Sequence, residues 1–394
     1  MKTQLTKLFV EFFETEQASG VILIPCTITS IAIANSYFGT GYLDFWHTKV
    51  GIEIGDTISL KYSLEHWIND GLMAIFFLLI GLEIERELYI GELSNPKSAS
   101  LPIVAAVGGM ATPALLHFLL NRGTETQEGI GIPMATDIAF ALGVLALLGN
   151  RVPISLKVFL TALAIIDDLG AIVVIALFYV SDFSLLYLVL ALGMFAGLLM
   201  LNRLGVHRLP FYIVPGFIMW YFMLKSGVHA TIAGVLLAFA IPFGRGDEQS
   251  PSYKLQHFLH KPVAFIIMPL FALANTGIAL AGNWLEGLAT SNSLGIFAGL
   301  FFGKPLGIVL FSLLAVKLSL SQLPSDVFLK HIIGAGFLGG IGFTMSIFIT
   351  LLAFSNPEIV QNSKISILVS SLLAGTVGFL ILNRQTASIS NRSV

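Results

Sequence analysis

Asp167 and Asp168 lie side by side in the middle of an apolar segment, LAIIDDLGAI at positions 163–172. Successive residues of a helix point about 100° apart, so the two carboxylates would reach different sides of one small volume. Because neighbouring carboxylates repel each other when both are ionised, at least one should hold a proton near neutral pH. Once deprotonated, the same oxygens suit a small hard cation. The pair predicts a site where a proton and a cation compete; aspartates satisfied by hydrogen bonds within a helix bundle are the alternative.

Lys304, in FGKPLG at 302–307, is a natural counter-ion for this pair. It lies about ten residues from either end of an apolar segment, too deep for its side chain to reach the surface readily. A lysine at such depth is expected to pair with a carboxylate, which here means Asp167 or Asp168. If the boundary of the segment were shifted, Lys304 would instead lie near the surface.

Thr136 and Asp137 end the segment GIGIPMATD at 129–137, whose glycines and proline weaken or break a helix. A second, glycine-rich interruption occupies 334–342. One broken helix in each half of a membrane chain indicates a transporter site. Asp137 could offset the positive ends of half-helices and Lys304 the negative ends. Close packing through small residues is the alternative.

Three further ionisable groups fall near the ends of apolar segments. Asp70 and Glu83 lie toward opposite ends of one segment, and Glu83 belongs to the charged stretch GLEIEREL at 81–88. Both acids are candidates for a funnel that attracts cations, with an interfacial charge cluster as the alternative for Glu83. His229, in GVHAT at 227–231, is a candidate pH-sensing group, although a lone histidine near a span end is more often structural.

The amino-acid composition indicates the environment in which these ionisable groups lie. Of the 394 residues, 56% are hydrophobic and only 11% charged, against roughly 25% charged residues in an ordinary soluble domain. So few charges could not cover a water-soluble protein, and most of the chain is therefore expected to contact membrane lipid. The net charge of −2 argues against a nucleic-acid partner. The sequence predicts no cofactor, no soluble partner and no enzymatic activity.

Apolar stretches of about 20 residues, the length that crosses a membrane, recur along the chain. They predict an all-α integral membrane protein of about twelve transmembrane helices in a single domain, 1–394, with a short amphipathic cytoplasmic segment at 1–16. The expected spans are approximately 18–38, 64–84, 99–120, 129–149, 155–180, 183–202, 209–224, 227–243, 258–282, 292–315, 331–354 and 364–383.

The distribution of Lys and Arg predicts the orientation, because these residues accumulate in cytoplasmic segments. With both termini inside, the expected cytoplasmic segments hold 15 of them and the outer segments hold five. This bias favours an even number of spans with both termini in the cytoplasm.

The longest outer loop, 39–62, contains apolar residues that alternate around Gly55 and Asp56. Because strand side chains alternate between two faces and glycine favours a turn, Lys49 to Tyr62 is expected to form a periplasmic β-hairpin, with a solvated loop as the alternative. An exposed hairpin can pair with a second copy, which predicts a homodimer through this loop.

These segments together resemble the NhaA family of bacterial sodium/proton antiporters, and the resemblance covers nearly the whole chain. The matching stretches are WIND at 67–70, GLE at 81–83, ATDIAF at 135–140, IIDDLG at 165–170, SGVHAT at 226–231, GKPLG at 303–307 and GGIGFTMS at 339–346.

The resemblance implies a twelve-helix fold with crossed, interrupted fourth and eleventh helices and inverted three-helix repeats. The expected topology agrees, since spans 3–5 begin inside and spans 10–12 begin outside. It also implies an electrogenic exchange of two protons for one Na+ or Li+, driven by the proton gradient across the bacterial inner membrane. Such exchange contributes to Na+ and pH homeostasis.

By the same resemblance, Asp168 is the principal cation ligand, Asp167 its neighbour and Lys304 a proton-sensitive partner. Asp137 compensates helix ends, and Thr136 lies beside the ion. One departure concerns the family's pH-sensing cluster near the start of the ninth helix, which often has an acid just before a histidine. Here a neutral amide, Gln256, precedes His257, so His257 is a candidate pH sensor but steep pH activation does not carry over.

Two other classes of membrane protein also use ionisable groups of these types. An intramembrane aspartyl protease also uses two buried aspartates, and GRGD at 244–247 fits its GxGD string. That string lies in a polar loop, however, where Asp247 has no reason to be desolvated. A proton-coupled carrier of an organic anion could use Lys304 as counter-ion, but two adjacent carboxylates favour a cation.

Overall fold

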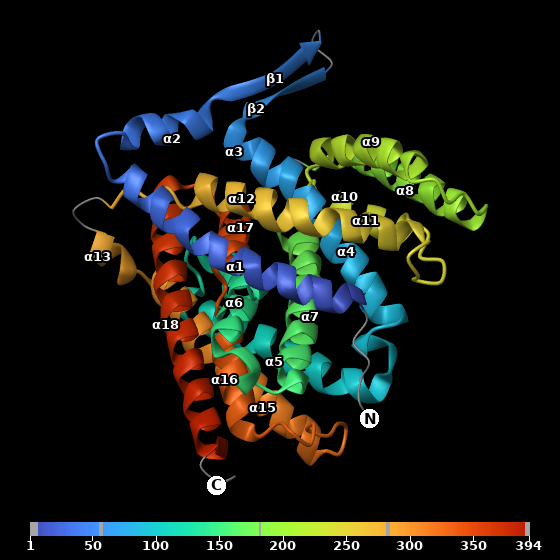
Figure 1. Ribbon diagram of the computed structural model, residues 1–394. Helices are drawn as coiled ribbons and strands as arrows, with labels where there is room; N and C mark the ends of the chain where they lie inside the picture. The colour runs from blue at the N-terminus through green and yellow to red at the C-terminus, as the bar shows by residue number, and fades with distance from the viewer. Residues whose placement is uncertain (1–6, 55–57, 181–182, 281–283, 391–394) are drawn as a thin grey trace. The chain divides into compact units, whose positions relative to one another are not determined.

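The computed structural model describes residues 7–54, 58–180, 183–280 and 284–390. Within these ranges the chain is mostly helical, and its strands form a single two-stranded sheet (Figure 1). The all-α class expected from the sequence is therefore confirmed for the described part of the chain.

Nine helical segments of the described residues are long and apolar enough to cross a membrane. A tenth candidate is the pair α16 (Leu329–Gly339) and α17 (Phe343–Ala353), which are bent by 45° at the break between them. The nine segments are Glu14–Ala34, Leu64–Tyr89, Pro96–Asn121, Gln127–Leu148, Ile154–Phe178, Leu185–Arg203, Pro251–Asn275, Ser291–Lys317 and Pro357–Arg384.

The two remaining expected spans, the seventh and eighth, correspond to shorter helices. Helix α9 (Pro210–Ser226) has 17 residues and α10 (Ile232–Ala240) has nine. Gly227, with a φ of 80°, ends α9 in the left-handed conformation that glycine adopts without strain. The count of about twelve spans therefore stays a prediction.

Contacts within the chain define two compact units. The first consists of Met1–Val21, Glu87–Phe178 and Ala281–Val394, and the second of Ile22–Arg86 and Tyr179–Leu280. Two of the four boundaries fall within helices, one in α1 (Lys7–Ala34) and one in α4 (Met73–Tyr89).

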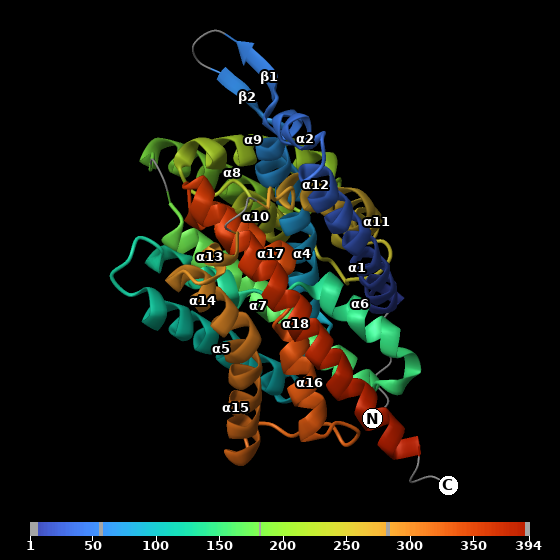
Figure 2. The same ribbon diagram turned by 90° about the vertical axis from the view of Figure 1, so that its left-hand side faces the viewer.

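The first unit carries the predicted aspartate pair. Its elements, besides parts of α1 and α4, are η2 (Glu92–Ser94), α5 (Pro96–Asn121), η3 (Gln127–Met134), α6 (Ile138–Leu148), η4 (Gly149–Arg151), α7 (Ile154–Phe178), α13 (Trp284–Leu288), α14 (Ser291–Phe297), η6 (Ala298–Gly303), α15 (Lys304–Lys317), α16, α17 and α18 (Pro357–Ser390). Helix α5 packs against α7 and α15, and α16 packs against α15 and α18. Helix α17 packs against α18 and the 3-10 helix η3, and α15 and α16 lie side by side in Figure 2.

The second unit contains the sheet and a helical cluster in which α8, α9 and α10 pack against one another. Its elements, besides parts of α1 and α4, are α2 (Gly39–His47), β1 (Lys49–Ile54), β2 (Ile58–Ser63), α3 (Leu64–His66), η1 (Trp67–Leu72), α8 (Leu185–Arg203), α9, α10, α11 (Pro251–Pro262), η5 (Val263–Ile267) and α12 (Met268–Asn275).

Strands β1 and β2 pair antiparallel, with Val50 opposite Tyr62 and Ile52 opposite Leu60. The expected hairpin is thus confirmed, although its turn at Gly55 and Asp56 lies outside the described residues. The short helix α2 precedes the hairpin and was not expected from the sequence.

Both expected helix interruptions are present in the first unit. Helix η3 stops at Met134, and residues 135–137 are extended before α6 begins at Ile138. Helix α16 stops at Gly339 and α17 begins at Phe343. Proline and glycine, which disfavour the helix interior, are sufficient to explain both breaks.

Two predicted boundaries differ from the structure. Helix α1 begins at Lys7, so the segment expected to precede the first span is largely continuous with it. Helix α11 begins at Pro251 rather than near 258, so Gln256 and His257 lie on a helix and not in a loop. Polar residues in its first turns lower the local hydropathy, whereas Pro251 suits a first helical turn and begins the helix there.

The close approach of α5 and α15 depends on two glycines. A side-chain carbon at Gly307 would collide with the carbonyl of Gly108, and one at Gly108 would collide with Phe311. Small residues let membrane helices approach closely, and α15 begins with Lys304, so this contact positions the predicted counter-ion.

We expect Gly307→Leu to lower the stability of the purified protein by about 1–3 kcal/mol, because overpacking forces the two backbones apart. The melting temperature in detergent measures the effect. Gly193→Leu on α8 is the matched control, because a side-chain carbon there meets nothing within 4 Å. Equal melting temperatures of the two variants would contradict the proposed close packing.

Candidate functional site

Thr136 and Asp137 occupy the extended link between η3 and α6. The backbone N–H of Asp137 donates to the carbonyl of Ile341 at 2.6 Å, and the Thr136 hydroxyl lies 2.8 Å from the carbonyl oxygen of Gly339. The two helix interruptions, which are distant in the sequence, therefore contact each other.

Asp137 accepts hydrogen bonds at the N-terminal ends of two helices. Its carboxylate accepts from the backbone N–H of Phe140 on α6 at 3.0 Å and from that of Thr344 on α17 at 3.0 Å. The Thr344 hydroxyl donates a further bond, and Asp137 is only 1% exposed. Unpaired N–H groups give a helix N-terminus a partial positive charge, so both helix ends stabilise an ionised Asp137.

Lys304 and Asp167 form a buried ion pair. Lys304 Nζ lies 2.5 Å from Asp167 Oδ2, and both side chains are fully buried. The same ammonium donates to the carbonyl of Met134, the last residue of η3. Lys304 thus neutralises both a carboxylate and the partial negative charge at the C-terminal end of a helix. This position agrees with the expectation that Lys304 offsets the negative end of a half-helix.

The Thr136 hydroxyl lies between two acceptors. Its Oγ1 is 2.7 Å from Asp167 Oδ2 and 2.8 Å from the Gly339 carbonyl oxygen, but a hydroxyl has one hydrogen to donate. When Asp167 is ionised, the hydroxyl can donate to it. When Asp167 is protonated, the acid can donate to Thr136, which is then free to donate to Gly339. The orientation of the hydroxyl is therefore coupled to the protonation of Asp167.

Asp168 lies beside this ion pair on α7 and is 1% exposed. The charge of Lys304 acts on it as well as on Asp167. Asp167 Oδ1 is buried and has no hydrogen-bond partner within the described ranges. A buried carboxylate oxygen without a partner is costly, and binding of a cation or a proton would remove that cost. The structure thus brings Thr136, Asp137, Asp167, Asp168 and Lys304 together in the first unit.

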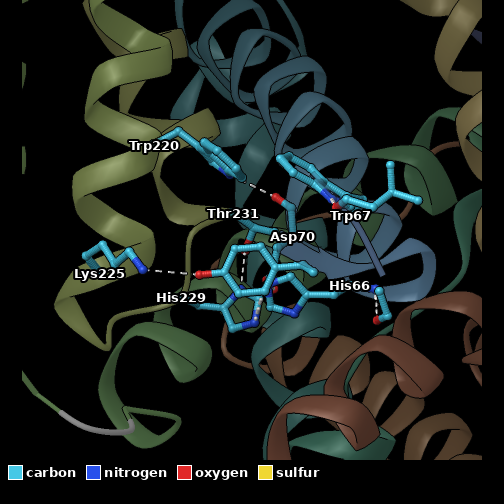
Figure 3. A network of polar contacts seen from close by, with 10 residues as sticks. His66, Trp67, Asp70, Trp220, Lys225, His229 and Thr231 are labelled. Carbon is cyan, nitrogen blue, oxygen red and sulfur yellow. Dashed lines mark hydrogen bonds and ion pairs between the residues drawn. The ribbon is translucent and has the colours of Figure 1, made fainter. Parts of the chain in front are cut away.

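Asp70 lies in a separate cluster, in the second unit (Figure 3). Its carboxylate is 3.1 Å from His66 Nε2 and 3.4 Å from His229 Nε2. His229 Nδ1 lies 3.0 Å from the hydroxyl of Thr231. Sequence reasoning missed His66, although its spacing of four residues from Asp70 places the two on one helix face.

Glu83, on α4, is 1% exposed and lies 3.2 Å from Nε2 of His260 on α11. Gln256 Nε2 is 3.4 Å from the same histidine nitrogen. His257, in contrast, is exposed, and its ring stacks on Tyr253 with a centroid distance of 6.3 Å. His260, rather than His257, is the histidine beside the acid, and nothing in the sequence linked these distant positions.

Asp247, the aspartate of the GxGD string, is exposed in a turn where its carboxylate accepts from the backbone N–H of Gln249 at 3.2 Å. A solvated carboxylate of this kind lacks the desolvation that a membrane aspartyl protease would need.

Two helix breaks in contact with each other, a buried ion pair and nine apolar helices among the described residues define a multi-pass membrane protein of the transporter class. The family model described as "Na+/H+ antiporter 1" matches residues 10–382. The chain belongs to this family. It is 61% identical over 386 residues to the Na(+)/H(+) antiporter NhaA of Dechloromonas aromatica, covering 97% of each chain. It is 61% identical over 379 residues to the Na(+)/H(+) antiporter NhaA of Flavobacterium psychrophilum, covering 96% of each.

We expect Lys304→Met to destabilise the protein by up to about 3–5 kcal/mol, because it leaves the buried carboxylate of Asp167 without its partner. The double variant Asp167→Asn/Lys304→Met removes both charges and should recover most of the lost thermal stability. Lys317→Met, at the exposed end of the same helix, is the control and should change little. A double variant as unstable as the sum of its single variants would contradict the coupling.

Proposed function

We propose that this chain exchanges cytoplasmic Na+ or Li+ for external H+ across the bacterial inner membrane, driven by the proton gradient. Its membership of the Na+/H+ antiporter family supports the exchange. The observation that supports this mechanism most directly is the fully buried Asp167–Lys304 ion pair, which lies where the two broken helices contact each other. Carboxylates at membrane depth mark ion pathways.

The charges of the site limit what can bind there. With all three side chains ionised, Asp167, Asp168 and Lys304 leave one uncompensated negative charge, whereas Asp137 is stabilised by two helix ends. A buried site strongly disfavours an uncompensated charge. Either one Na+ or one proton neutralises it, so the two ions compete for the same position.

A second proton requires a second titrating group. If only Asp168 exchanged its proton for Na+, the exchange would be electroneutral. Electrogenic exchange needs Asp167 or Lys304 to change protonation in the same cycle. Two contacts support a change in the protonation of Asp167 or Lys304 during the cycle. Both the short Lys304–Asp167 contact and the position of the Thr136 hydroxyl between Asp167 and Gly339 depend on the charge of Asp167.

We propose the following cycle. Protonated aspartates face one side of the membrane, release their protons and accept Na+ through carboxylate oxygens, with the Thr136 hydroxyl beside the ion. Asp137 and Lys304 hold the half-helix ends in place. The loaded site then reorients and releases Na+ on the other side. This activity would contribute to Na+ and pH homeostasis of the cell.

The arrangement in the membrane is proposed to be about twelve spans with inverted three-helix repeats and both termini in the cytoplasm, as the Lys and Arg bias favours. The chain, 1–394, would act as one antiporter domain. The hairpin of β1 and β2 is a two-stranded sheet with open edges, so it supports a homodimer formed through residues 39–62.

Asp70 and Glu83 are proposed to influence how cations approach the site, and His229 and His257 how it responds to pH. The contacts of Asp70 with His66 and His229, and of Glu83 with His260, join these acids to imidazole side chains. The neutral Gln256 beside His260 favours a shallow pH response.

We expect Asp168→Asn to abolish Na+-evoked proton movement in everted membrane vesicles, because the amide can neither release a proton nor offer a charged ligand. A pH-sensitive dye reports the proton flux on addition of Na+ or Li+. Asp247→Asn, in the exposed turn, is the matched control and should retain the flux. Retained exchange in Asp168→Asn at normal expression would count against the proposed site.

A further inference from the structure

An apolar groove lies in the second unit, apart from the residues of the proposed exchange. Its volume is about 340 Å³, and its walls come from three helical segments: η1 with α4, α9, and α10.

Small residues line this space from all three helical segments. Gly71 and Ala74 line it from η1 and α4, Gly216 from α9, and Ala233 and Gly234 from α10. A side-chain carbon at Gly216 or Gly234 would collide with the opposite helix, whereas one at Gly71 meets only the ring of Trp67, at 3.5 Å. The space beside Gly71 can thus be filled without a backbone clash.

The walls of the groove select an apolar occupant. Among the described lining residues, polar side-chain groups come from Trp67 and Trp220, and both indoles already donate their N–H. Trp67 donates to the carbonyl of Val50 and Trp220 to that of Asp70, each at 2.9 Å. A polar ligand would lose its hydrogen bonds with water and gain none here.

The rim of the groove faces outward along α9. Phe217 is 60% and Ile213 39% exposed at the rim, and the neighbouring Val214 is 62% exposed. In a membrane protein, large apolar side chains exposed along a helix face lipid hydrocarbon. The groove is therefore filled from the acyl chains around it rather than from water.

One end of the groove has the composition of a membrane interface. The rings of Trp67 and Trp220 stack with centroids 6.1 Å apart, and the Tyr62 ring lies 6.2 Å from that of Trp67. Lys225 Nζ donates to the Tyr62 hydroxyl at 3.3 Å (Figure 3). Aromatic and cationic side chains gather where lipid headgroups lie.

The length of the groove matches one acyl chain. From Trp67 to Leu78 a helix rises on the order of 16 Å at 1.5 Å per residue. This is about half of the roughly 30 Å hydrocarbon core, the depth that the acyl chains of one leaflet occupy.

From these observations we infer that the groove binds one acyl chain of a membrane phospholipid, with the phosphate of that lipid at the Lys225 end. The lipid would link η1, α4, α9 and α10 as a structural component of the second unit. The apolar walls hold the chain, and the aromatic and cationic end sets the depth of the headgroup.

Tryptophan fluorescence tests this site, because two of the four tryptophans line the groove. In a Trp46→Phe/Trp284→Phe background, only Trp67 and Trp220 emit. Titrating the purified protein in detergent with phospholipid brominated along its acyl chains should give quenching that saturates near one lipid per protein. Adding Gly71→Leu should raise the half-saturating lipid concentration at least tenfold, and Gly71→Ala should give a smaller increase.

Gly197→Leu on α8 is the matched control, because a side-chain carbon there meets nothing within 4 Å, and it should leave the titration unchanged. Quenching that never saturates, or that is the same in both Gly71 variants and the parent, would overturn the inference. Emission that depends on protein concentration and not on lipid would show a second copy in the groove and would overturn it too.

Discussion

The ion pair between Asp167 and Lys304 is the interaction on which the rest of the first unit depends. Two unit charges removed from water are tolerated only if each is held by a partner in good geometry. The fold meets this condition by bringing the helix interruptions of two distant spans into contact, so that the Met134 carbonyl and the Thr136 hydroxyl complete the surroundings of the pair. Packing of α5 on α15 through glycine fixes where the lysine lies.

The charges at this site compensate one another in two separable ways. Asp137 is stabilised by the N-terminal ends of α6 and α17. With all three side chains ionised, Asp167, Asp168 and Lys304 retain one unbalanced negative charge that a mobile cation must neutralise. In the proposed exchange, Na+ and protons would neutralise this remaining charge in turn.

The sequence predicts the long apolar helices, the two breaks and the hairpin, because hydropathy, glycine and proline act locally. It also identifies the buried aspartates and lysine, since a charge within an apolar segment is conspicuous. It does not predict which aspartate pairs with Lys304, that Thr344 binds Asp137, or that His260 rather than His257 lies beside Glu83. Each of these depends on contacts between distant segments. The early start of α11 at Pro251 was not expected, because hydropathy averages over the polar residues of its first turns.

In the proposed exchange, protons and Na+ compete for one set of buried carboxylates. The most direct measurement is the number of protons released when Na+ binds to the purified protein in a weakly buffered solution. The account predicts that adding Na+ or Li+ releases protons, and that the apparent Na+ affinity falls as the pH is lowered. Na+ binding without proton release, at an affinity independent of pH, would contradict it.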